Sequence, residues 1–337
     1  MQSKQISSPK HRWGEKPFYS LDYYLKQTFG EKVYKIALEG GMTCPNRDGT
    51  IGTGGCIFCS AGGSGEFAAG GKSVISQINT GIKHLESGRK ETGQKYIAYF
   101  QSFSNTYAPV NSLRSMYFEA LSHPDVVALS VATRPDCFSS GIYDLLEECN
   151  QKAPAWVELG LQTIHENTAK FIRRGYSLDI FENTVHELRK RDINVIVHII
   201  LGLPGETKQD VLETIHYLND MDIQGIKLQL LHILRGTDLA NYIQTQSYAD
   251  NPCALTSLTD SSYPQNGLIH ILTEDEYVDL ILSCIGNLSP DIVIHRLTGD
   301  GPKDLLLAPL WSLNKRKVLN HISHAMKVQD SYQGKFL

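Results

Sequence analysis

The sequence predicts an α/β protein whose parallel sheet is open or curled into a partial barrel. Six short runs are rich in β-branched residues and almost continuously apolar, as strands are when helices cover both faces of a sheet. Stretches with the apolar spacing of helices follow most of these runs. Successive strand–helix units imply right-handed connections between parallel strands, and such sheets bind ligands at the carboxyl ends of their strands.

The predicted strands and helices alternate along the first two thirds of the chain. The strands are Val33–Leu38, Tyr96–Phe100, Val126–Val131, Trp156–Leu161, Val195–Leu201 and Ile226–Leu231. The helices are Val74–Leu85, Leu113–Leu121, Ile142–Asn150, Ile180–Arg191 and Gln209–Met221. In the fourth helix Val185 and Leu188 fall on one face, which we expect the sheet to cover.

The last hundred residues have a different pattern. Residues 242–268 are rich in Ser, Thr, Asn and Pro, which predicts a long connection. Thr273 precedes three acidic residues, which predicts the N-cap and first turn of a helix that ends near residue 288. We expect one more strand at 291–295 and a final helix over about 308–329.

The composition is ordinary for a folded protein, with 41% hydrophobic and 20% charged residues among 337. It excludes a disordered chain, a collagen-like protein and a coiled-coil rod. The longest apolar run, near Val195–Leu203, is too short to span a membrane, and no secretory signal begins the sequence. We therefore expect a cytoplasmic protein with no membrane partner, whose thiols stay reduced and available to metals.

The charge is spread unevenly along the chain. The net charge is −4, but residues 1–35 carry +4 and residues 311–337 carry another +4, which leaves −12 for the middle. Basic ends on an acidic body suit a polyanion such as RNA, whereas no DNA partner is expected from the overall charge. Terminal helices with solvated lysines explain the same pattern, and charge alone leaves both interpretations open.

The segment 40–71 contains 11 of the 28 glycines and three of the seven cysteines. Cys44, Cys56 and Cys59 follow the first predicted strand with the spacing C-x11-C-x2-C, which places two thiolates on one turn. Glycines let the backbone wrap closely around a bulky inorganic group. The spacing therefore predicts a metal centre in this loop.

Two kinds of metal centre remain open from the spacing alone. Four ligands usually complete a structural zinc site or an iron–sulfur cluster, and this loop has three cysteines. A four-iron cluster on three cysteines would leave one iron open, as catalytic metal sites do. A zinc ion with a fourth ligand from elsewhere is the alternative. We expect the remaining cysteines to be buried small apolar side chains; they are Cys137, Cys149, Cys253 and Cys284.

Several motifs together resemble the YtqA/YhcC-like family of the radical SAM superfamily, in its elongator-like and coproporphyrinogen-oxidase-like branch. The similarity runs from about residue 17 to residue 334. The motifs are GGMTCPNRDG at 40–49, GCIFCSA at 55–61, VELGLQT at 157–163, HIILGLPGE at 198–206, LHILRGT at 231–237, RLTGD at 296–300 and LWSL at 310–313.

The resemblance implies a partial (β/α)6 barrel of the TIM type with a C-terminal α/β extension. The implied parts are a basic N-terminal extension at 1–32, the barrel core at 33–240, and an extension with a basic terminal helix at 241–337. It also implies that the three cysteines hold a [4Fe-4S] cluster whose fourth iron binds S-adenosylmethionine (SAM). One-electron reduction would then cleave SAM and give a 5′-deoxyadenosyl radical.

Further site residues follow from the resemblance. Phe58 would pack near the adenine of SAM, although a core aromatic is the alternative. Glu158, expected at the carboxyl end of a strand, would contact SAM unless it is only ion-paired. Gly202 and Glu206 would turn the chain over the cofactor, although Glu206 could serve only as the first acid of the next helix.

Two more residues complete the predicted site. Gln101 stands where many superfamily members carry a Gly-Gly-Glu-like motif for the amino group of SAM, so it is a predicted cofactor ligand. Arg235, after the sixth strand, is a predicted catalytic clamp for a carboxylate or phosphate, because its fork suits bidentate anions.

The resemblance finally implies a tRNA-modifying enzyme. The implied reaction converts 5-carboxymethylaminomethyl uridine at the wobble position to the 5-aminomethyl form. The implied partners are tRNA and a one-electron donor such as flavodoxin or ferredoxin. Two alternatives stay open: radical chemistry on a small molecule such as a porphyrinogen, and a non-catalytic, zinc-stabilised RNA-binding adaptor.

Overall fold

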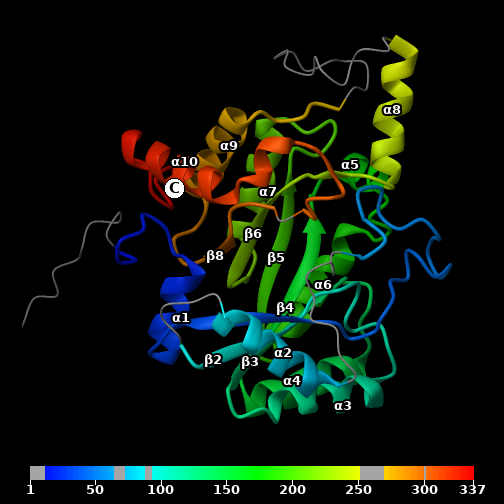
Figure 1. The fold of residues 1–337 in the computed structure, drawn as a ribbon, viewed down its shortest axis with the longest axis vertical. Helices are drawn as coiled ribbons and strands as arrows, with labels where there is room; N and C mark the ends of the chain where they lie inside the picture. Colours follow the sequence, from blue (N-terminus) through cyan, green and yellow to red (C-terminus); the bar gives the residue numbers. More distant parts are fainter. Residues whose placement is uncertain (1–11, 64–72, 88–92, 251–268, 300) are drawn as a thin grey trace, which may run out of the picture. The chain divides into compact units, whose positions relative to one another are not determined.

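The computed structural model describes residues 12–63, 73–87, 93–250, 269–299 and 301–337. Residues 1–11 of the predicted basic extension, Cys253 and Asp300 lie outside the described residues. Among these residues, seven strands form one sheet in the order β1-β2-β3-β4-β5-β6-β8 (Figure 1). Strands β7 and β9 form a second, two-stranded sheet. The predicted fold class, an α/β partial barrel with a parallel sheet, is confirmed.

The strands of the larger sheet agree closely with the predicted ones. They are β1 (Val33–Leu38), β2 (Lys95–Phe100), β3 (Val126–Thr133), β4 (Ala155–Gln162), β5 (Asn194–Leu201), β6 (Gly225–Leu230) and β8 (Val293–Arg296). The smaller sheet has β7 (Ile233–Leu234) and β9 (Leu306–Ala308). The α-helices are α1 (Leu21–Phe29), α2 (Val74–Ser87), α3 (Val110–Leu121), α4 (Ser140–Lys152), α5 (Glu166–Phe171), α6 (Leu178–Arg189), α7 (Lys208–Asn219), α8 (Asp238–Asp250), α9 (Glu274–Asn287) and α10 (Lys315–Val328).

The chain forms two compact units. The cysteine unit comprises Leu25–His198, and the terminal unit comprises Met1–Tyr24 with Ile199–Leu337. This is a division by packing, so the predicted domain boundaries at residues 32 and 240 stay a prediction. None of the helices among the described residues is long and apolar enough to cross a membrane.

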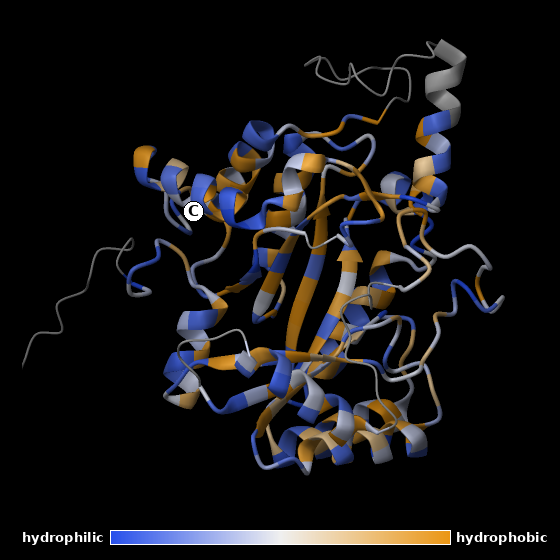
Figure 2. Cartoon of the chain, viewed as in Figure 1, coloured by the Kyte–Doolittle hydropathy of each residue, from blue (hydrophilic) through white to orange (hydrophobic). Residues whose placement is uncertain are grey.

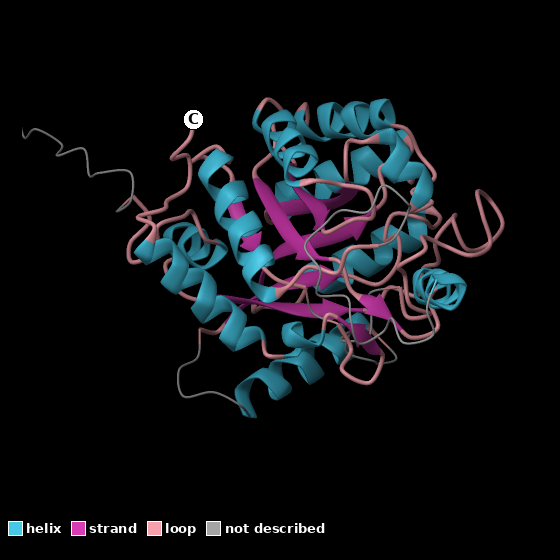
Figure 3. Ribbon diagram, turned by 90° about the horizontal axis from the view of Figure 1, so that it is seen from above, coloured by secondary structure: helices cyan, strands magenta, loops and turns pink. Residues whose placement is uncertain are grey.

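In the cysteine unit the register brings the carboxyl ends of neighbouring strands together. Leu38, the last residue of β1, pairs with Phe100, the last residue of β2, and Phe100 pairs with Val131 near the end of β3. Helix α2 packs on β1, α3 packs on β3 and α4, and α4 packs on β4. The strands are mostly apolar and helices cover them (Figures 2 and 3). The loops that follow these strands therefore start from one edge of the sheet.

In the terminal unit α9 packs against both α7 and α10, and β6 pairs in parallel with β8. The predicted N-cap is confirmed: the Thr273 hydroxyl accepts a hydrogen bond from the Glu276 N–H, and the Glu276 carboxylate accepts one from the Thr273 N–H. This reciprocal pair satisfies two backbone donors at the start of α9 and fixes where the helix begins.

Three predictions about the late elements were wrong in part. Residues 242–250 belong to α8 rather than to a connection, because the Thr237 hydroxyl accepts from the Ala240 N–H and caps the helix. Residues 251–268 of that predicted connection lie outside the described residues. The predicted final helix divides into β9, a 3-10 turn at Leu310–Leu313 and α10, with Pro309 and the capping residue Asn314 at the divisions. The predicted strand at 291–295 begins later, at Val293.

Candidate metal centre

The loop that carries Cys44, Cys56 and Cys59, called the cysteine loop below, follows the carboxyl end of β1. Hydrogen bonds between its own backbone groups shape it. The N–H groups of Arg47 and Asp48 donate to the carbonyl of Cys44, at 2.8 and 3.2 Å, which makes a turn just after the first cysteine. The Cys59 N–H donates to the Cys56 carbonyl at 3.0 Å, which makes the second turn. Both turns lie at cysteines, so the backbone itself sets the direction of their side chains.

Arg47 fastens the two ends of this loop together. Its Nη2 donates to the carbonyl oxygens of Cys59 and Ser60, at 3.1 and 2.5 Å. Its guanidinium carbon lies 5.7 Å from the centre of the Phe103 ring, which belongs to the segment after β2. Gly55 makes room for this side chain, because a Cβ there would lie 2.9 Å from Arg47 Nε and the backbone φ is +73°. The arginine therefore joins the part of the loop after Cys44 to the part at Cys59 and Ser60.

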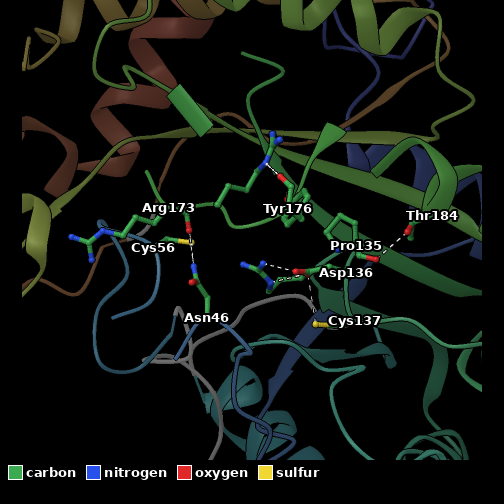
Figure 4. Close-up of polar contacts among 11 residues, drawn as sticks. Asn46, Cys56, Pro135, Asp136, Cys137, Arg173, Tyr176 and Thr184 are labelled. Atoms are coloured by element: carbon green, nitrogen blue, oxygen red, sulfur yellow. Dashed lines mark hydrogen bonds and ion pairs between the residues drawn. The ribbon is translucent and has the colours of Figure 1, made fainter. Parts of the chain in front are cut away.

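Asn46 links the loop to the segment that follows α5 (Figure 4). Its side-chain Nδ2 donates to the Arg173 carbonyl at 2.6 Å and to the Cys56 Sγ at 3.6 Å. The Cys56 thiol itself also lies 3.6 Å from the Arg173 carbonyl. Asn46 is buried, and Arg173 has a positive φ of 57°. One amide thus connects a cysteine sulfur to a backbone carbonyl more than a hundred residues further along the chain.

An ion pair borders the cysteines on the side of β3. Arg134 Nε and Nη2 donate to the two carboxylate oxygens of Asp136 at 2.8 and 2.7 Å. The guanidinium carbon of Arg134 lies 5.1 Å from the centre of the Tyr176 ring. Both side chains of the pair are almost buried, at 11% and 10% exposure. Because the pair is bidentate, it holds a cation in a fixed place near the cysteine loop.

These surroundings shift the acidity of the thiols. The pKa of Cys56 is lowered to about 7, mainly by a hydrogen bond from Cys59 and further by Arg134, Asn46 and Arg47, against the opposing effect of burial. The pKa of Cys59 is raised well above its usual value by the same hydrogen bond with Cys56 and by burial. The loop therefore favours the thiolate at Cys56, and thiolates are the form that binds metals.

The three thiols fit the donor chemistry of a metal centre. Two sulfurs bound to one zinc ion at about 2.3 Å each can lie at most about 4.6 Å apart. The structure describes all three thiols, and their sulfur atoms do not all lie within 4.8 Å of one another. Cys56 and Cys59 are nevertheless hydrogen-bonded to each other, so the sulfurs are not uniformly far apart. Three thiols fit a four-iron cluster with one open iron, and they also fit three of the four ligands of a zinc ion, so the geometry leaves the zinc alternative open.

Two predicted cofactor ligands lie close to this loop in the fold. Phe58 is half-buried between the second and third cysteines, and Gln101 is half-buried directly after β2. The Gln101 N–H donates to the Leu38 carbonyl at 3.3 Å, and the Ser104 N–H donates to the Thr43 carbonyl at 3.3 Å. The segment after β2 is thus joined to the loop after β1. The roles of Phe58 and Gln101 stay predictions.

Glu158 lies elsewhere than expected. It is the fourth residue of the eight-residue strand β4, not a residue at its carboxyl end, because β4 continues to Gln162. Its fully buried carboxylate accepts from Lys35 Nζ at 2.5 Å and Ser130 Oγ at 2.8 Å, and lies 2.7 Å from His198 Nε2. The ion-paired interpretation of this residue is therefore realised, and its contact with SAM stays a prediction.

The remaining predicted site residues belong to the terminal unit. Gly202 and Gly205 have φ values of +82° and +83°, which suits a sharply turning segment after β5. Glu206 is buried and precedes Thr207, the N-cap of α7, so it is not a first-turn residue of that helix. Arg235 is exposed between β7 and α8, and its N–H donates to the Leu305 carbonyl at 2.7 Å. Their functional roles stay predictions.

Sequence reasoning missed several residues around the cysteines. Asn46 and Arg47 stand inside the CPNRDG motif, and Arg134 and Asp136 come three and five residues after the end of the third predicted strand at Val131. Polar residues at the carboxyl end of a predicted strand were the signal that could have found the last two. Arg173 gave no such signal, because its contribution is a backbone carbonyl.

Comparisons with known proteins agree with this geometry. Residues 47–218 match the radical SAM superfamily, and residues 256–328 match the Radical_SAM C-terminal domain. The uncharacterized protein YtqA of Bacillus subtilis is 43% identical over 323 residues, covering 96% of this chain and 93% of YtqA. Protein YhcC of Escherichia coli is 35% identical over 292 residues, covering 86% of each chain.

Two further proteins are similar to this chain at lower identity. A tRNA-2-methylthio-N(6)-dimethylallyladenosine synthase of Buchnera aphidicola is 27% identical over 164 residues, which are 47% of this chain and 36% of that protein. The solved structure of an archaeal Elp3 from Methanocaldococcus infernus matches with a TM-score of 0.63 and 15% identity. It covers 89% of this chain and 64% of its own, and at this identity the likeness shows the fold alone.

Proposed function

The chain belongs to the YtqA/YhcC-like family of the radical SAM superfamily, and from this premise we propose that it is a tRNA-modifying enzyme acting on the wobble uridine. The proposed reaction converts a 5-carboxymethylaminomethyl uridine to the 5-aminomethyl form. In this proposal Cys44, Cys56 and Cys59 hold a [4Fe-4S] cluster that has one open iron for SAM. When bound, the cluster and SAM supply one-electron chemistry that cleaves SAM and removes a hydrogen atom from the substrate.

The cysteine loop is the observation that supports the cluster. It offers three thiols at the carboxyl edge of the sheet, one of them with its pKa lowered to about 7. Three cysteines leave one iron of a four-iron cluster without a protein ligand, which is the open position that SAM needs. Two guanidinium groups, those of Arg47 and Arg134, place positive charge near thiolates that would otherwise repel one another.

The chain's own residues would bind and orient the cofactor and the substrate. Phe58, Gln101 and Glu158 are the proposed SAM contacts of the cysteine unit. Gly202 and Glu206 keep the role toward SAM that the resemblance implies for them. Arg235 is exposed, so its fork is free to approach an anion such as the carboxylate of the modified uridine. An arginine holds a carboxylate through two parallel hydrogen bonds, which would fix the carbon beside it for hydrogen abstraction.

Two observations support tRNA as the substrate. One distant relative is named as a tRNA-modifying synthase. Helix α10 has no acidic residue, and its Lys315, Arg316 and Lys327 are exposed. Such a helix suits contacts with a phosphate backbone. On the substrate, the 5′-deoxyadenosyl radical would take one hydrogen atom from the carbon between nitrogen and carboxylate. Return of one electron to the cluster that SAM cleavage had oxidised, with loss of a proton from the nitrogen, would leave an imine. Addition of water to the imine would release the amine and glyoxylate.

The test is anaerobic incubation of the reconstituted, reduced protein with SAM and bulk tRNA from a cell that lacks the gene. We expect 5-aminomethyl uridine to replace the carboxymethylaminomethyl form in digested tRNA, and glyoxylate to appear in equal amount. Cys59→Ala is the matched control and should give neither product. Cleavage of SAM that ignores tRNA and leaves its nucleosides unchanged would contradict the tRNA substrate and favour a small molecule.

A further inference from the structure

The amide of Asn46 points at the sulfur of a proposed cluster ligand. Its Nδ2 lies 3.6 Å from Cys56 Sγ and 2.6 Å from the Arg173 carbonyl oxygen (Figure 4). An amide nitrogen carries two hydrogens, so one serves each acceptor. Sulfur ligands that accept hydrogen bonds change the reduction potential of an iron–sulfur cluster.

The packing around Asn46 keeps this amide in place. A Cβ at position 52 would lie 2.8 Å from Asn46 Oδ1, and a Cβ at position 175 would lie 3.8 Å from the same oxygen. Both positions are glycines, and Gly175 has a φ of +82°. The Gly55 N–H donates to the Asn46 carbonyl at 2.7 Å, which fixes the backbone of the residue. The residue is 5% exposed, so water does not compete for the hydrogens of its amide.

The neighbouring cations are already engaged. The Arg134 guanidinium is paired with Asp136 through two hydrogen bonds, and Arg47 Nη2 donates to two backbone carbonyls. Both contribute charge from a distance, whereas Asn46 donates directly to a ligand sulfur. A donor at sulfur stabilises the extra negative charge of a reduced cluster more than it stabilises the oxidised cluster.

We propose that Asn46 tunes the cluster by donating an N–H···S hydrogen bond to the Cys56 thiolate, and that it raises the cluster's reduction potential. This inference rests on the proposed function only in assuming that the loop holds a cluster. In this role Asn46 acts through the cluster, by making it easier to reduce by a one-electron donor. The Arg173 carbonyl orients the amide by accepting its other hydrogen.

The test is a redox titration followed by the electron paramagnetic resonance signal of the reduced cluster, with iron and sulfide measured on each protein. In Asn46→Ala, we expect the ratio of reduced to oxidised cluster at a fixed applied potential to fall by about a factor of three to ten. A tenfold fall corresponds to ~59 mV for one electron. Asn46→Asp keeps the shape but replaces the donor with a negative charge, so the ratio should fall further.

Thr50→Ala is the matched control in the same loop. The Thr50 hydroxyl is hydrogen-bonded to the Tyr107 hydroxyl at 2.9 Å, and this bond does not involve a cysteine sulfur, so its loss should leave the potential unchanged. A fully loaded Asn46→Ala protein with the wild-type potential would overturn the inference. So would failure of both Asn46 variants to load while Thr50→Ala loads, since Asn46 would then build the loop rather than tune it. A wild-type protein that takes up no cluster would instead overturn the proposed function.

Discussion

The ammonium group of Lys35 on β1 lies 2.5 Å from the carboxylate of Glu158 on β4, within the apolar strands of the cysteine unit. The Glu158 side chain is completely buried, and the Lys35 ammonium also lies 4.8 Å from the centre of the Tyr99 ring. Ser130 and His198 contact the same carboxylate. These partners compensate the desolvation penalty of the buried carboxylate. Removing one of them leaves part of that penalty uncompensated and lowers the free energy of unfolding.

Lys35→Met should therefore lower the free energy of unfolding by about 3 kcal/mol, since it leaves the Glu158 charge buried without its cation. Urea denaturation of the purified protein measures this effect. Adding Glu158→Gln to Lys35→Met should restore at least half of the lost stability, because the amide carries no charge to compensate. A double variant whose loss equals the sum of the two single losses would contradict the coupling of these residues.

The stability of the protein at alkaline pH should depend on the ionisation of two buried thiols, those of Cys149 and Cys284. Burial raises the pKa values of Cys149 and Cys284 to about 12, whereas an unfolded cysteine has a pKa of about 8.5. The stabilising contribution of each protonated thiol is complete below pH 8.5 and is lost as the pH rises toward 12, because only the unfolded chain ionises there. At pH 10 the loss should be about 2 kcal/mol for each thiol.

Denaturation curves at pH 8 and pH 10 measure this loss. Cys284→Ala should be less stable than wild type at pH 8 because it leaves a small cavity, but its stability should fall less between the two pH values. An equal fall in the variant and in wild type would contradict the assignment of this pH dependence to Cys284.

Helix α10 should contribute to tRNA binding through charge. Arg316 and Lys327 are exposed, and each contact with a phosphate adds about 0.7 to 0.9 to the slope of log affinity against log salt. Arg316→Ala combined with Lys327→Ala should weaken binding and reduce that slope by about 1.5. Fluorescence anisotropy of labelled tRNA over a series of salt concentrations gives both numbers.

Lys317→Ala is the control for the helix. The Lys317 ammonium lies 2.8 Å from Glu274, so its charge is largely compensated and its loss should change the slope less. Equal slopes in wild type and in the Arg316/Lys327 double variant would show that tRNA does not bind along α10.

Metal binding should depend on three cysteines and not on the others. Cys44→Ala, Cys56→Ala and Cys59→Ala should each abolish iron binding after anaerobic reconstitution, because three ligands are the fewest that hold a four-iron cluster with one open site. Cys284→Ala is the control, since Cys284 is a fully buried residue of α9. Iron retained by Cys44→Ala would remove Cys44 from the ligand set.

The main elements could be predicted from the sequence wherever local pattern and tertiary burial agree. Val33–Leu38 was predicted to the residue because the apolar run ends where the glycine-rich loop begins. Thr273 and Glu276 predicted the start of α9, since a capping box needs only local contacts. Helix α8 was missed because its Ser, Thr and Asn residues suggest a loop, and the cap at Thr237 was overlooked.

The candidate site could be predicted only in part for a different reason. The cysteine spacing is local, so it indicates the metal centre without any knowledge of the fold. The hydrogen bond from Asn46 to Cys56 depends on the carbonyl of Arg173, a residue brought near by the pairing of strands. Similarly, the contact between Lys35 on β1 and Glu158 on β4 depends on how the sheet brings these two strands together. A single sequence does not show this arrangement.

The most direct test of the account is the formation of 5′-deoxyadenosine from SAM by the anaerobically reconstituted, reduced protein, with metal content measured on the same sample. The account predicts iron and sulfide in the wild-type protein, production of 5′-deoxyadenosine, and loss of both in Cys59→Ala. A wild-type protein that binds zinc in place of iron and forms no 5′-deoxyadenosine would contradict it.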